Sequence, residues 1–468
     1  MDDEWQGRNV LVLGLGETGL SCVRWLARHG ARLVAADTRA APPALGAVRA
    51  EHPQLRVVLG PLDEALLAGV DTVVASPGIA LREPVLRAAA ARGIEVAGDV
   101  EVFARALARG GKGVRVLGVT GTNGKSTVTA LAAAMARAAG LDAPAIGNIG
   151  VPVLEALGRA EAQGFPDLYV VELSSYQLET TSSLALDAAT VLNVTQDHLD
   201  RYDTLADYAR AKERIFRHCA RRVVNRDDPW SSRMADPASW SFGLGEPRGD
   251  GEWGLDAGTR TLRRGTRALL RVDEMGMTGL HNVANGLAAH ALATAAGLAP
   301  EPLARALAEF KGLPHRVQPV AEARGVRFYD DSKGTNVGAA VAALEGFDVP
   351  VVLIAGGEGK GQDFAPLAPA VKAHARAVVL IGRDAGILAA ALAPAGVPIA
   401  RAATMEEAVA AAFAAAREGD AVLLSPACAS FDMFRGYGHR GEVFAAAARA
   451  LGTGHGSTPD VPCPPGRG

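Results

Sequence analysis

One stretch of the 468-residue chain decides how it folds: Gly118-Val119-Thr120-Gly121-Thr122-Asn123-Gly124-Lys125-Ser126-Thr127. The mostly apolar residues 114–119 predict a buried strand, and the Ala-rich residues 128–139, closed by Gly140, predict a helix. A glycine-rich turn between a strand and a helix presents backbone N–H groups and the positive helix end to phosphate oxygens. The stretch therefore predicts a loop that holds the phosphates of a nucleoside triphosphate.

The residues of this loop have separate predicted tasks. Lys125 reaches the outer phosphates, and Ser126 or Thr127 offers a hydroxyl to Mg²⁺. The common motif has glycine at the position of Val119, so the match is to a Thr-Gly-Thr-Asn-Gly-Lys-Ser-Thr variant. A simple tight turn is the structural alternative, but Gly-Lys-Ser-Thr in this setting favours phosphate binding. The residues predicted to bind ATP here are Gly121, Thr122, Asn123, Gly124, Lys125, Ser126 and Thr127.

Length and composition describe a large globular protein. At roughly 150 residues per domain, the chain of 468 residues predicts three domains. Hydrophobic residues make up 49% and charged residues 21%, which excludes disorder as a general description. The net charge is −3 and no Lys/Arg stripe is present, so we expect no nucleic-acid partner.

Cysteines and apolar runs indicate the compartment. Cys22, Cys219, Cys428 and Cys463 are widely separated without any Cys-x-x-Cys spacing, which predicts reduced thiols rather than a metal or redox site. The first residues are acidic and polar, and no apolar run approaches membrane-spanning length. We expect a cytoplasmic protein with no membrane partner, and we expect it to be a monomer.

The first domain has the pattern of a dinucleotide-binding fold. A strand at 9–13 leads into Gly14-Leu15-Gly16-Glu17-Thr18-Gly19, and a strand at 32–36 ends at Asp37, where an acidic residue would meet a ribose hydroxyl. A strand at 71–75 ends in Ser76-Pro77-Gly78, an ordinary turn or a ligand-binding strand end. Residues 104–113 interrupt the pattern, so we predict a Rossmann-like domain over 1–109.

The central domain, predicted over 110–313, places polar residues at the ends of apolar strands. A strand at 168–171 ends at Glu172, where a Mg²⁺ ligand would lie beside a phosphate loop, and a strand at 190–194 leads to His198. A helix at 208–219 carries Lys212, which on pattern alone is a solvated basic residue. A helix at 279–296 carries Asn282 and Asn285 on one face, as surface or capping amides or as readers of a nucleobase. Residues 231–274 are polar and Gly-rich, and we expect strands and turns there.

The last domain alternates strands and helices again. The linker Leu313-Pro314-His315-Arg316 precedes strands at 327–329, 351–354, 377–381 and 421–424, separated by Ala-rich helices. We predict an α/β domain over 314–452 and a disordered tail over 453–468. The whole chain is thus expected to be α/β with three domains: a Rossmann-like N-terminal domain, a central P-loop ATPase-like mixed-sheet domain and a C-terminal Rossmann-like domain.

The order of these motifs resembles the Mur ligase superfamily of ATP-dependent amide-forming enzymes, over roughly residues 10–451. The motifs are the phosphate loop, Glu172-Leu-Ser-Ser, Asp197-His198, His281-Asn282-x-x-Asn285 and His315-Arg316. Two loops of the last domain are similar to those of the D-glutamate-adding members. They are Asp331-Ser332-Lys333-Gly334-Thr335-Asn336 and Ser425-Pro-Ala-Cys-Ala-Ser430-Phe431-Asp432.

The resemblance implies a reaction and its participants. ATP would phosphorylate the carboxylate of UDP-N-acetylmuramoyl-L-alanine, and the amine of D-glutamate would then attack the acyl phosphate, with two Mg²⁺ ions present. Lys212 would carry CO₂ as a carbamate and serve as a metal-site ligand. The implied catalytic residues are Lys125, Glu172, His198 and Lys212, and the implied metal ligands are Ser126, Thr127, Glu172, His198 and carbamylated Lys212.

The resemblance also implies binding residues in all three domains. For the UDP substrate they are Gly14, Thr18, Asp37, Thr38, Arg39, Ser76, Gly78, Asn148 and Gln177. For ATP, beyond the phosphate loop, they are Asn282, Asn285, Arg316, Asp331 and Lys333. For D-glutamate they are Thr335, Lys360, Ser430, Phe431 and Tyr437.

Three other functions remain open at this point. A Mur-type ligase could add a different amino acid, the Gly14 to Gly19 motif could belong to an NAD-dependent dehydrogenase, and a phosphate loop could serve a non-catalytic nucleotide switch. The dehydrogenase leaves the phosphate loop and Glu172 without a role. The switch leaves the polar loops of the last domain without one. ADP release that depends on an amino acid would separate a ligase from a switch.

Overall fold

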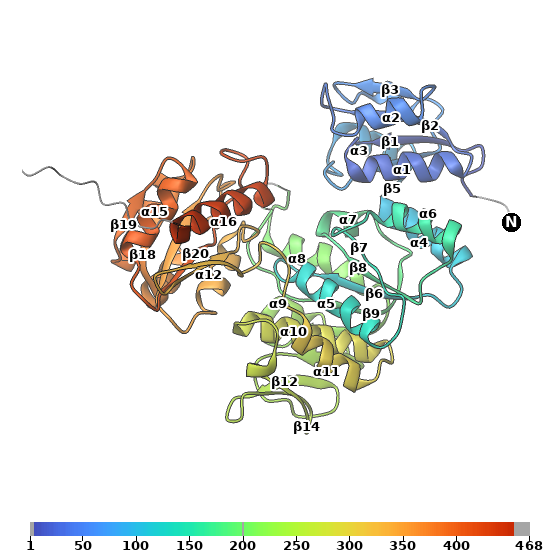
Figure 1. Cartoon of the computed structure of the whole chain (residues 1–468). Coiled ribbons are helices and arrows are strands. Elements are labelled where there is room, and N and C mark those ends of the chain that lie inside the picture. Colours follow the sequence, from blue (N-terminus) through green and yellow to red (C-terminus); the bar gives the residue numbers. More distant parts are fainter. Residues whose placement is uncertain (1–3, 199–200, 454–468) are drawn as a thin grey trace, which may run out of the picture. The chain divides into compact units, whose positions relative to one another are not determined.

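The computed structural model describes residues 4–198 and 201–453 (Figure 1). The chain divides after Gly312 into two compact units. The first unit contains a five-stranded and a nine-stranded sheet, and the second contains a six-stranded sheet. The predicted α/β class with three successive sheets is confirmed, whereas the exact domain bounds remain predictions.

The first sheet is entirely parallel in the order β3-β2-β1-β4-β5. From β1 the chain adds β2 and β3 on one side of the sheet, and it then adds β4 and β5 on the other side of β1. The turns after β1 and β4 therefore lie where the strand order reverses, which is where ligands bind in such folds. Helix α4 follows the sheet and joins it to the next one. The elements are β1 (Asn9–Leu13), α1 (Glu17–Arg28), β2 (Arg32–Asp37), α2 (Leu45–Glu51), β3 (Arg56–Leu59), β4 (Thr72–Ala75), α3 (Pro84–Ala91), β5 (Glu95–Ala97) and α4 (Asp99–Gly110).

The second sheet has the order β14-β13-β12-β11-β10-β9-β6-β8-β7, and it is parallel except that β13 pairs antiparallel with both β12 and β14. Its central strands are continuous buried runs because helices cover both faces. The strands are β6 (Arg115–Thr120), β7 (Ala145–Gly147), β8 (Leu168–Glu172), β9 (Ala185–Val191), β10 (His218–Asn225), β11 (Trp240–Phe242), β12 (Glu252–Asp256), β13 (Thr261–Arg264) and β14 (Arg267–Arg271). The strands and turns expected in 231–274 are therefore present.

Two helix layers enclose this second sheet. One apolar cluster joins it to α5 (Lys125–Ala138), α10 (Leu280–Ala295) and α11 (Pro300–Glu309). The opposite cluster joins it to α4, α6 (Val153–Gln163), α7 (Ser175–Glu179) and α8 (Leu205–Glu213), and it continues into α1 and the first sheet through the buried side chain of Trp25. This shared core holds the first sheet and the second sheet in one unit.

Three predicted boundaries in this unit are wrong. The strand expected at 190–194 is β9, which ends at Val191, because the next residues turn to the phosphate loop and the Asn193 carbonyl accepts the Thr122 N–H at 2.9 Å. The helix expected through Cys219 ends with α8 and a short 3₁₀ turn at Arg214–Phe216, because β10 starts at His218 and pairs with β9. Residues 104–110, expected to interrupt the pattern, complete α4.

The second unit is a doubly wound sheet in the order β15-β16-β20-β17-β18-β19, with only β15 antiparallel. Helices α12, α13 and α14 pack on one face and α15 and α16 on the other. The elements are β15 (Gln318–Ala323), β16 (Val326–Asp330), α12 (Val337–Leu344), β17 (Val351–Gly356), α13 (Leu367–His374), β18 (Ala375–Ile381), α14 (Ala385–Leu392), β19 (Ile399–Arg401), α15 (Met405–Ala415), β20 (Ala421–Leu424) and α16 (Tyr437–Thr453).

The end of the chain differs slightly from the predicted tail. Helix α16 runs to Thr453, so Gly452 and Thr453 are helical, and the remaining residues 454–468 of the predicted tail lie outside the described part of the chain. Across residues 4–198 and 201–453, no helix combines the length and apolar character that crossing a bilayer requires.

Candidate active site

A cavity of about 630 Å³ brings the turns of the first sheet beside the phosphate loop of the second sheet. This is the size of a pocket that holds a cofactor or a drug-sized ligand. The end of β2 and the turns after β1, β2 and β4 line one part, and residues from α5, α7, α8 and the loop after β9 line the other. The predicted site residues on its wall are Gly14, Thr18, Asp37, Thr38, Arg39, Ser76, Gly78, Lys125, Asn148, His198 and Lys212.

A buried carboxylate shapes the first-sheet part of the cavity. Asp37 accepts the Leu15 N–H at 2.6 Å and two guanidinium N–H groups of Arg39 at 2.9 and 2.7 Å. The hydrogen bonds from Arg39 lower the pKa of Asp37 to about 2. The Ser76 hydroxyl donates to the Gly14 carbonyl at 3.0 Å, which ties the turn after β4 to the turn after β1. A side chain at Gly14 would meet Ser76 at 2.8 Å, so this close approach requires glycine.

The phosphate loop brings two lysines to one carbonyl oxygen. Lys125 Nζ donates to Gly121 O at 2.9 Å and to Thr122 O at 2.8 Å, and Lys212 Nζ donates to Gly121 O at 2.8 Å. Helix α5 begins at Lys125 because Gly124 has φ 84°, a left-handed conformation that suits glycine. A Cβ atom at Gly124 would lie 2.5 Å from Asn285 Oδ1. The predicted residue Asn285 thus lies against the phosphate loop. Its Nδ2 donates a hydrogen bond to Asn282 Oδ1 at 3.2 Å.

Lys212 is fully enclosed, contrary to the solvated lysine that the helix pattern alone suggests. Its side chain is 1% exposed and lies 4.3 Å from the centroid of the Tyr208 ring. Burial, followed by repulsion from Lys125, lowers the pKa of Lys212 well below its ordinary value. The sequence missed this environment because α8 contacts the phosphate loop only in the folded chain. A buried amine with a depressed pKa is available in its neutral, nucleophilic form.

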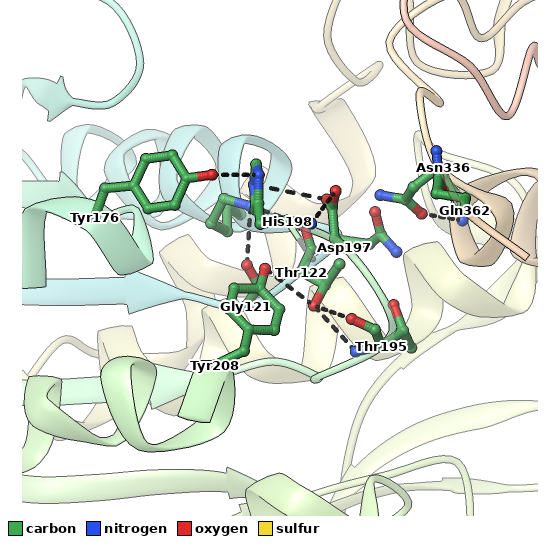
Figure 2. Close-up of polar contacts among 12 residues, drawn as sticks. Gly121, Thr122, Tyr176, Thr195, Asp197, His198, Tyr208, Asn336 and Gln362 are labelled. Carbon is green, nitrogen blue, oxygen red and sulfur yellow. Dashed lines mark hydrogen bonds and ion pairs between the residues drawn. The ribbon is translucent and has the colours of Figure 1, made fainter. Parts of the chain in front are cut away.

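A chain of contacts positions His198. Its Nδ1 lies 2.7 Å from the Tyr176 hydroxyl (Figure 2). The Arg201 guanidinium lies 4.4 Å from the centroid of the Tyr176 ring. Arg201 also donates to Glu179 at 2.5 Å and to the Pro77 carbonyl at 3.3 Å. The loop after β4 is therefore connected to His198 through Arg201 and Tyr176. The backbone of His198 has φ 56°, which is uncommon for a residue other than glycine.

The buried carboxylate of Glu172 fits a cation ligand. Its Oε1 accepts the Asn148 amide at 2.8 Å, whereas Oε2 is buried without a hydrogen-bond partner among the described residues. Ser126 and Thr127 are buried in the first turn of α5. Within residues 4–198 and 201–453, no three His, Cys, Asp or Glu side chains come together as a metal cage. Mg²⁺ needs no such cage, since it keeps waters and uses one or two carboxylates together with substrate phosphates.

Gln177 lies beneath the cavity rather than on its wall. Its amide oxygen accepts the N–H of Ser174, and its amide nitrogen lies 3.4 Å from Asp99 Oδ2. Burial raises the pKa of Asp99 to about 6. Gln177 thereby supports Ser174, which does line the cavity.

The second unit gathers its predicted residues on loops at the ends of β16, β17 and β20. Asp331 accepts the Ser425 hydroxyl at 2.7 Å, and burial raises the pKa of Asp331 to about 7. Lys333 Nζ lies 5.1 Å from the centroid of the Tyr437 ring. Asp330 Oδ2 lies 2.6 Å from Nδ1 of His315, next to the predicted residue Arg316. The predicted residues Thr335, Lys360, Ser430, Phe431 and Tyr437 occupy these loops and the start of α16.

Sequence reasoning missed several side chains that shape these sites. Tyr176, Tyr208 and Asp99 contact predicted residues in the first unit, Arg201 contacts Tyr176, and Arg440 is buried under the loops of the second. None belongs to a local motif that pattern reading would single out.

Three family models match successive parts of the chain. They describe a Mur ligase MurD-like N-terminal domain over residues 8–98, a Mur ligase middle domain over 119–293 and a Mur ligase glutamate ligase domain over 315–428. Curated proteins named UDP-N-acetylmuramoylalanine--D-glutamate ligase are similar over almost the whole chain. The one from Methylobacillus flagellatus is 55% identical over 95% of this chain and 97% of its own length, and the one from Nitrosospira multiformis is 53% identical over 95% and 96%.

Solved structures share the fold at low sequence identity. A UDP-N-acetylmuramate-alanine ligase from Thermotoga maritima has a TM-score of 0.59 at 18% identity, covering 94% of this chain and 99% of that chain. A pseudomurein peptide ligase type C from Methanothermus fervidus has a TM-score of 0.56 at 17% identity, with coverages of 89% and 96%.

Proposed function

The chain belongs to the Mur ligase family, and we infer from this membership how its residues divide the work of the reaction. That reaction is the ATP-dependent addition of D-glutamate to UDP-N-acetylmuramoyl-L-alanine in peptidoglycan precursor synthesis. The observation that carries it is 55% identity to a ligase of this activity over 95% of the chain. An NAD-dependent dehydrogenase is disfavoured because it leaves Lys125 and Lys212 at the cavity without a task.

The two chemical steps define what the site has to do. A carboxylate is a poor electrophile, so a carboxylate oxygen of the L-alanyl group first bonds to the γ-phosphorus of ATP while the bond to ADP breaks. The amine of D-glutamate then attacks the carbonyl carbon, a C–N bond forms, inorganic phosphate leaves and the amine loses a proton. The first step concentrates negative charge and the second needs a neutral amine and a stabilised oxyanion.

We propose that the lysines at Gly121 O serve the first step. The Lys125 ammonium donates to the Gly121 and Thr122 carbonyl oxygens, and it is proposed to turn to the anionic phosphate oxygens of ATP when they bind. Burial lowers the pKa of Lys212 well below its ordinary value, and we propose that its unprotonated amine adds CO₂ and loses a proton to become a carbamate. The carbamate would place a negative charge near Glu172 and His198, the other proposed catalytic residues.

Two Mg²⁺ ions are proposed cofactors, and when bound they neutralise the phosphate oxygens during phosphoryl transfer. Glu172 Oε2, which is buried and accepts no hydrogen bond from the described residues, is the best-supported protein ligand. The proposed ligands are Ser126, Thr127, Glu172, His198 and carbamylated Lys212. His198 is kept in place for this task by the Tyr176 hydroxyl at Nδ1.

The substrate assignments are proposals that the cavity supports to different degrees. Eight of the predicted UDP-substrate residues and Lys125 of the phosphate loop line it, so the UDP substrate is proposed to run from the first-sheet turns past Asn148 to Lys125. Asn282 and Asn285 are proposed to contact ATP beside Gly124. The remaining ATP residues Arg316, Asp331 and Lys333 and the D-glutamate residues Thr335, Lys360, Ser430, Phe431 and Tyr437 are proposed within the second unit.

Phosphate release tests this function directly. The purified chain is supplied with UDP-N-acetylmuramoyl-L-alanine, ATP and Mg²⁺, and amino acids of both hands are screened one at a time. We expect release with D-glutamate alone, because a cation at Lys360 with hydroxyl donors around it can hold two carboxylates. Release with L-alanine or lysine, but not with D-glutamate, would assign the chain to another ligase of the family. Tighter calorimetric binding of NAD than of UDP would reverse the assignment of the first domain.

The setting of the enzyme is also proposed. Its small-molecule substrates, ATP and a UDP-linked precursor, suit a cytoplasmic enzyme, and we propose that it acts as a monomer without a nucleic-acid or membrane partner. The net charge of −3 fits the absence of a nucleic-acid partner. Sedimentation at assay concentrations tests the monomer.

A further inference from the structure

Arg440, in the first turns of α16, is completely buried and makes four hydrogen bonds to the loops above it. Its Nε donates to Ser332 Oγ at 2.9 Å and one terminal nitrogen donates to Ser332 O at 2.7 Å. The other terminal nitrogen donates to Cys428 O at 3.1 Å and to Ala429 O at 3.3 Å. All four acceptors are neutral oxygens. The guanidinium therefore acts here through its several N–H donors and not through an ion pair with these acceptors.

These acceptors connect three loops and a helix. Ser332 belongs to the loop after β16, and its hydroxyl also donates to the Tyr437 carbonyl at the start of α16, at 2.8 Å. Ala429 belongs to the loop after β20, and its carbonyl also accepts the Glu358 N–H of the loop after β17, at 3.0 Å. One guanidinium thus holds the loops after β16 and β20 directly, and the loop after β17 through Ala429.

The segments tied to Arg440 are the ones that carry the proposed D-glutamate residues. Thr335 lies three residues after Ser332, and Lys360 lies two residues after Glu358. Ser430 and Phe431 directly follow Ala429. The backbone carbonyl of Tyr437 accepts a hydrogen bond from the Ser332 hydroxyl. Every proposed contact to the amino acid is therefore within three residues of a segment that Arg440 orders.

Burying a guanidinium that has no carboxylate hydrogen-bonded to it costs free energy of folding. We therefore expect Arg440 to contribute to function in return. Loops that are ordered before binding lose less conformational entropy when the ligand arrives. Burial lowers the pKa of Arg440 to about 10, which still leaves the guanidinium charged at neutral pH. The positive charge beneath the loops also favours an anionic amino acid over a neutral or cationic one.

We propose that Arg440 is a positioning residue for the incoming amino acid, which presets the three loops of the D-glutamate site and supplies positive potential beneath them. The proposal rests on the proposed D-glutamate function and assigns a residue that acts through Thr335, Lys360 and Ser430 rather than by touching the substrate. It predicts that losing Arg440 weakens the use of D-glutamate more than the use of the UDP substrate, whose proposed residues lie in the first unit.

The test compares Arg440→Met with Arg376→Met. Arg376 lies in the same unit and forms a two-pronged ion pair with Asp420, with N–O distances of 2.5 and 3.0 Å, so its variant controls for losing a paired arginine. We expect KM for D-glutamate to rise at least tenfold in Arg440→Met, with KM for the UDP substrate within threefold of wild type. Arg440→Lys keeps the positive charge. It should still raise KM for D-glutamate about fivefold, because one ammonium group cannot donate hydrogen bonds to all four oxygens.

A general loss of structure would look different. An equal change in the KM values for D-glutamate and for the UDP substrate, or a fall in kcat alone that follows the fraction of folded protein by thermal unfolding, would overturn the proposal. If Arg440→Met does not fold, Ser332→Ala removes only the hydroxyl that joins Arg440 to Tyr437, and it should raise KM for D-glutamate about threefold. An unchanged KM there also contradicts the proposal. Wild-type protein that does not release phosphate with D-glutamate would instead refute the proposed function.

Discussion

The chain contains two glycine-rich turns that join a strand to a helix, and they differ in charge. The turn after β1 is closed by the carboxylate of Asp37, which accepts the Leu15 N–H and binds Arg39. The turn after β6 brings the side-chain nitrogens of Lys125 and Lys212 to the carbonyl of Gly121. Both turns face one cavity. The two turns share a backbone motif, and the side chains brought to each of them are the basis on which we propose substrate binding for the first and phosphoryl transfer for the second.

The largest expected effect comes from removing the cation of the second turn. Lys125→Ala should lower kcat/KM by about 10³-fold, because phosphoryl transfer depends on neutralising charge at the phosphates. Steady-state phosphate release measures it. Lys112→Ala, which changes an exposed lysine in the loop before β6, is the control and should stay within twofold. A loss of less than tenfold in Lys125→Ala would mean that the two turns do not differ in catalytic role.

The second lysine should have a large and partly reversible effect. Lys212→Ala should lower activity by about 10²-fold, and added acetate should restore part of it, because a small carboxylate can replace the carbamate in the vacated space. The assay is phosphate release with and without acetate. Exposed Lys311→Ala serves as the control and should not respond to acetate. Full activity of Lys212→Ala without an additive would show that this lysine has no catalytic task.

The carboxylate of the first turn should affect a different substrate. Asp37→Asn weakens the charge-assisted bonds from Leu15 and Arg39, and we expect KM for the UDP substrate to rise about tenfold while KM for ATP stays within twofold. Steady-state kinetics with each substrate varied in turn separates the two. If KM for ATP rises equally, the two turns are not independent binding elements.

The smallest expected effect concerns acid stability. The folded-state pKa of Asp37 lies at about 2, below its ordinary value, so the stabilisation that it contributes is present above about pH 4 and is lost as the pH falls toward 2. Between pH 5 and pH 3, wild type should lose roughly 1 kcal/mol more unfolding free energy than Asp37→Asn. Urea unfolding at both pH values measures the difference. Glu246→Gln, which removes an exposed carboxylate, should decline like wild type.

The two turns could be predicted because each is local in the sequence. A strand, its glycines and the following helix lie within a few tens of residues, and the hydrophobic period marks the strand and the helix separately. The glycines follow from backbone geometry, since Gly124 and Gly14 both have positive φ. Glu172 was predictable for the same reason, as the residue at which a buried strand ends.

Other features depended on contacts between distant segments. The burial of Lys212 depends on α8 reaching Gly121, which lies 91 residues earlier. The strand β10 was missed because its pairing with β9, and not its own pattern, ends the preceding helix. Arg440 looked like an ordinary basic residue until the loops after β16 and β20 met at its guanidinium.

The sequence by itself therefore determined the α/β class, the three successive sheets and the chemical types of residue at the strand ends, because these depend on spacing along the chain. Only the tertiary structure decided which side chains share an environment. It placed Lys212 beside Lys125, put Tyr176 against His198 and buried Arg440 beneath three loops. The physical reason is that burial and charge interactions are properties of neighbours in space, and they change the pKa and the availability of a group whose sequence pattern stays the same.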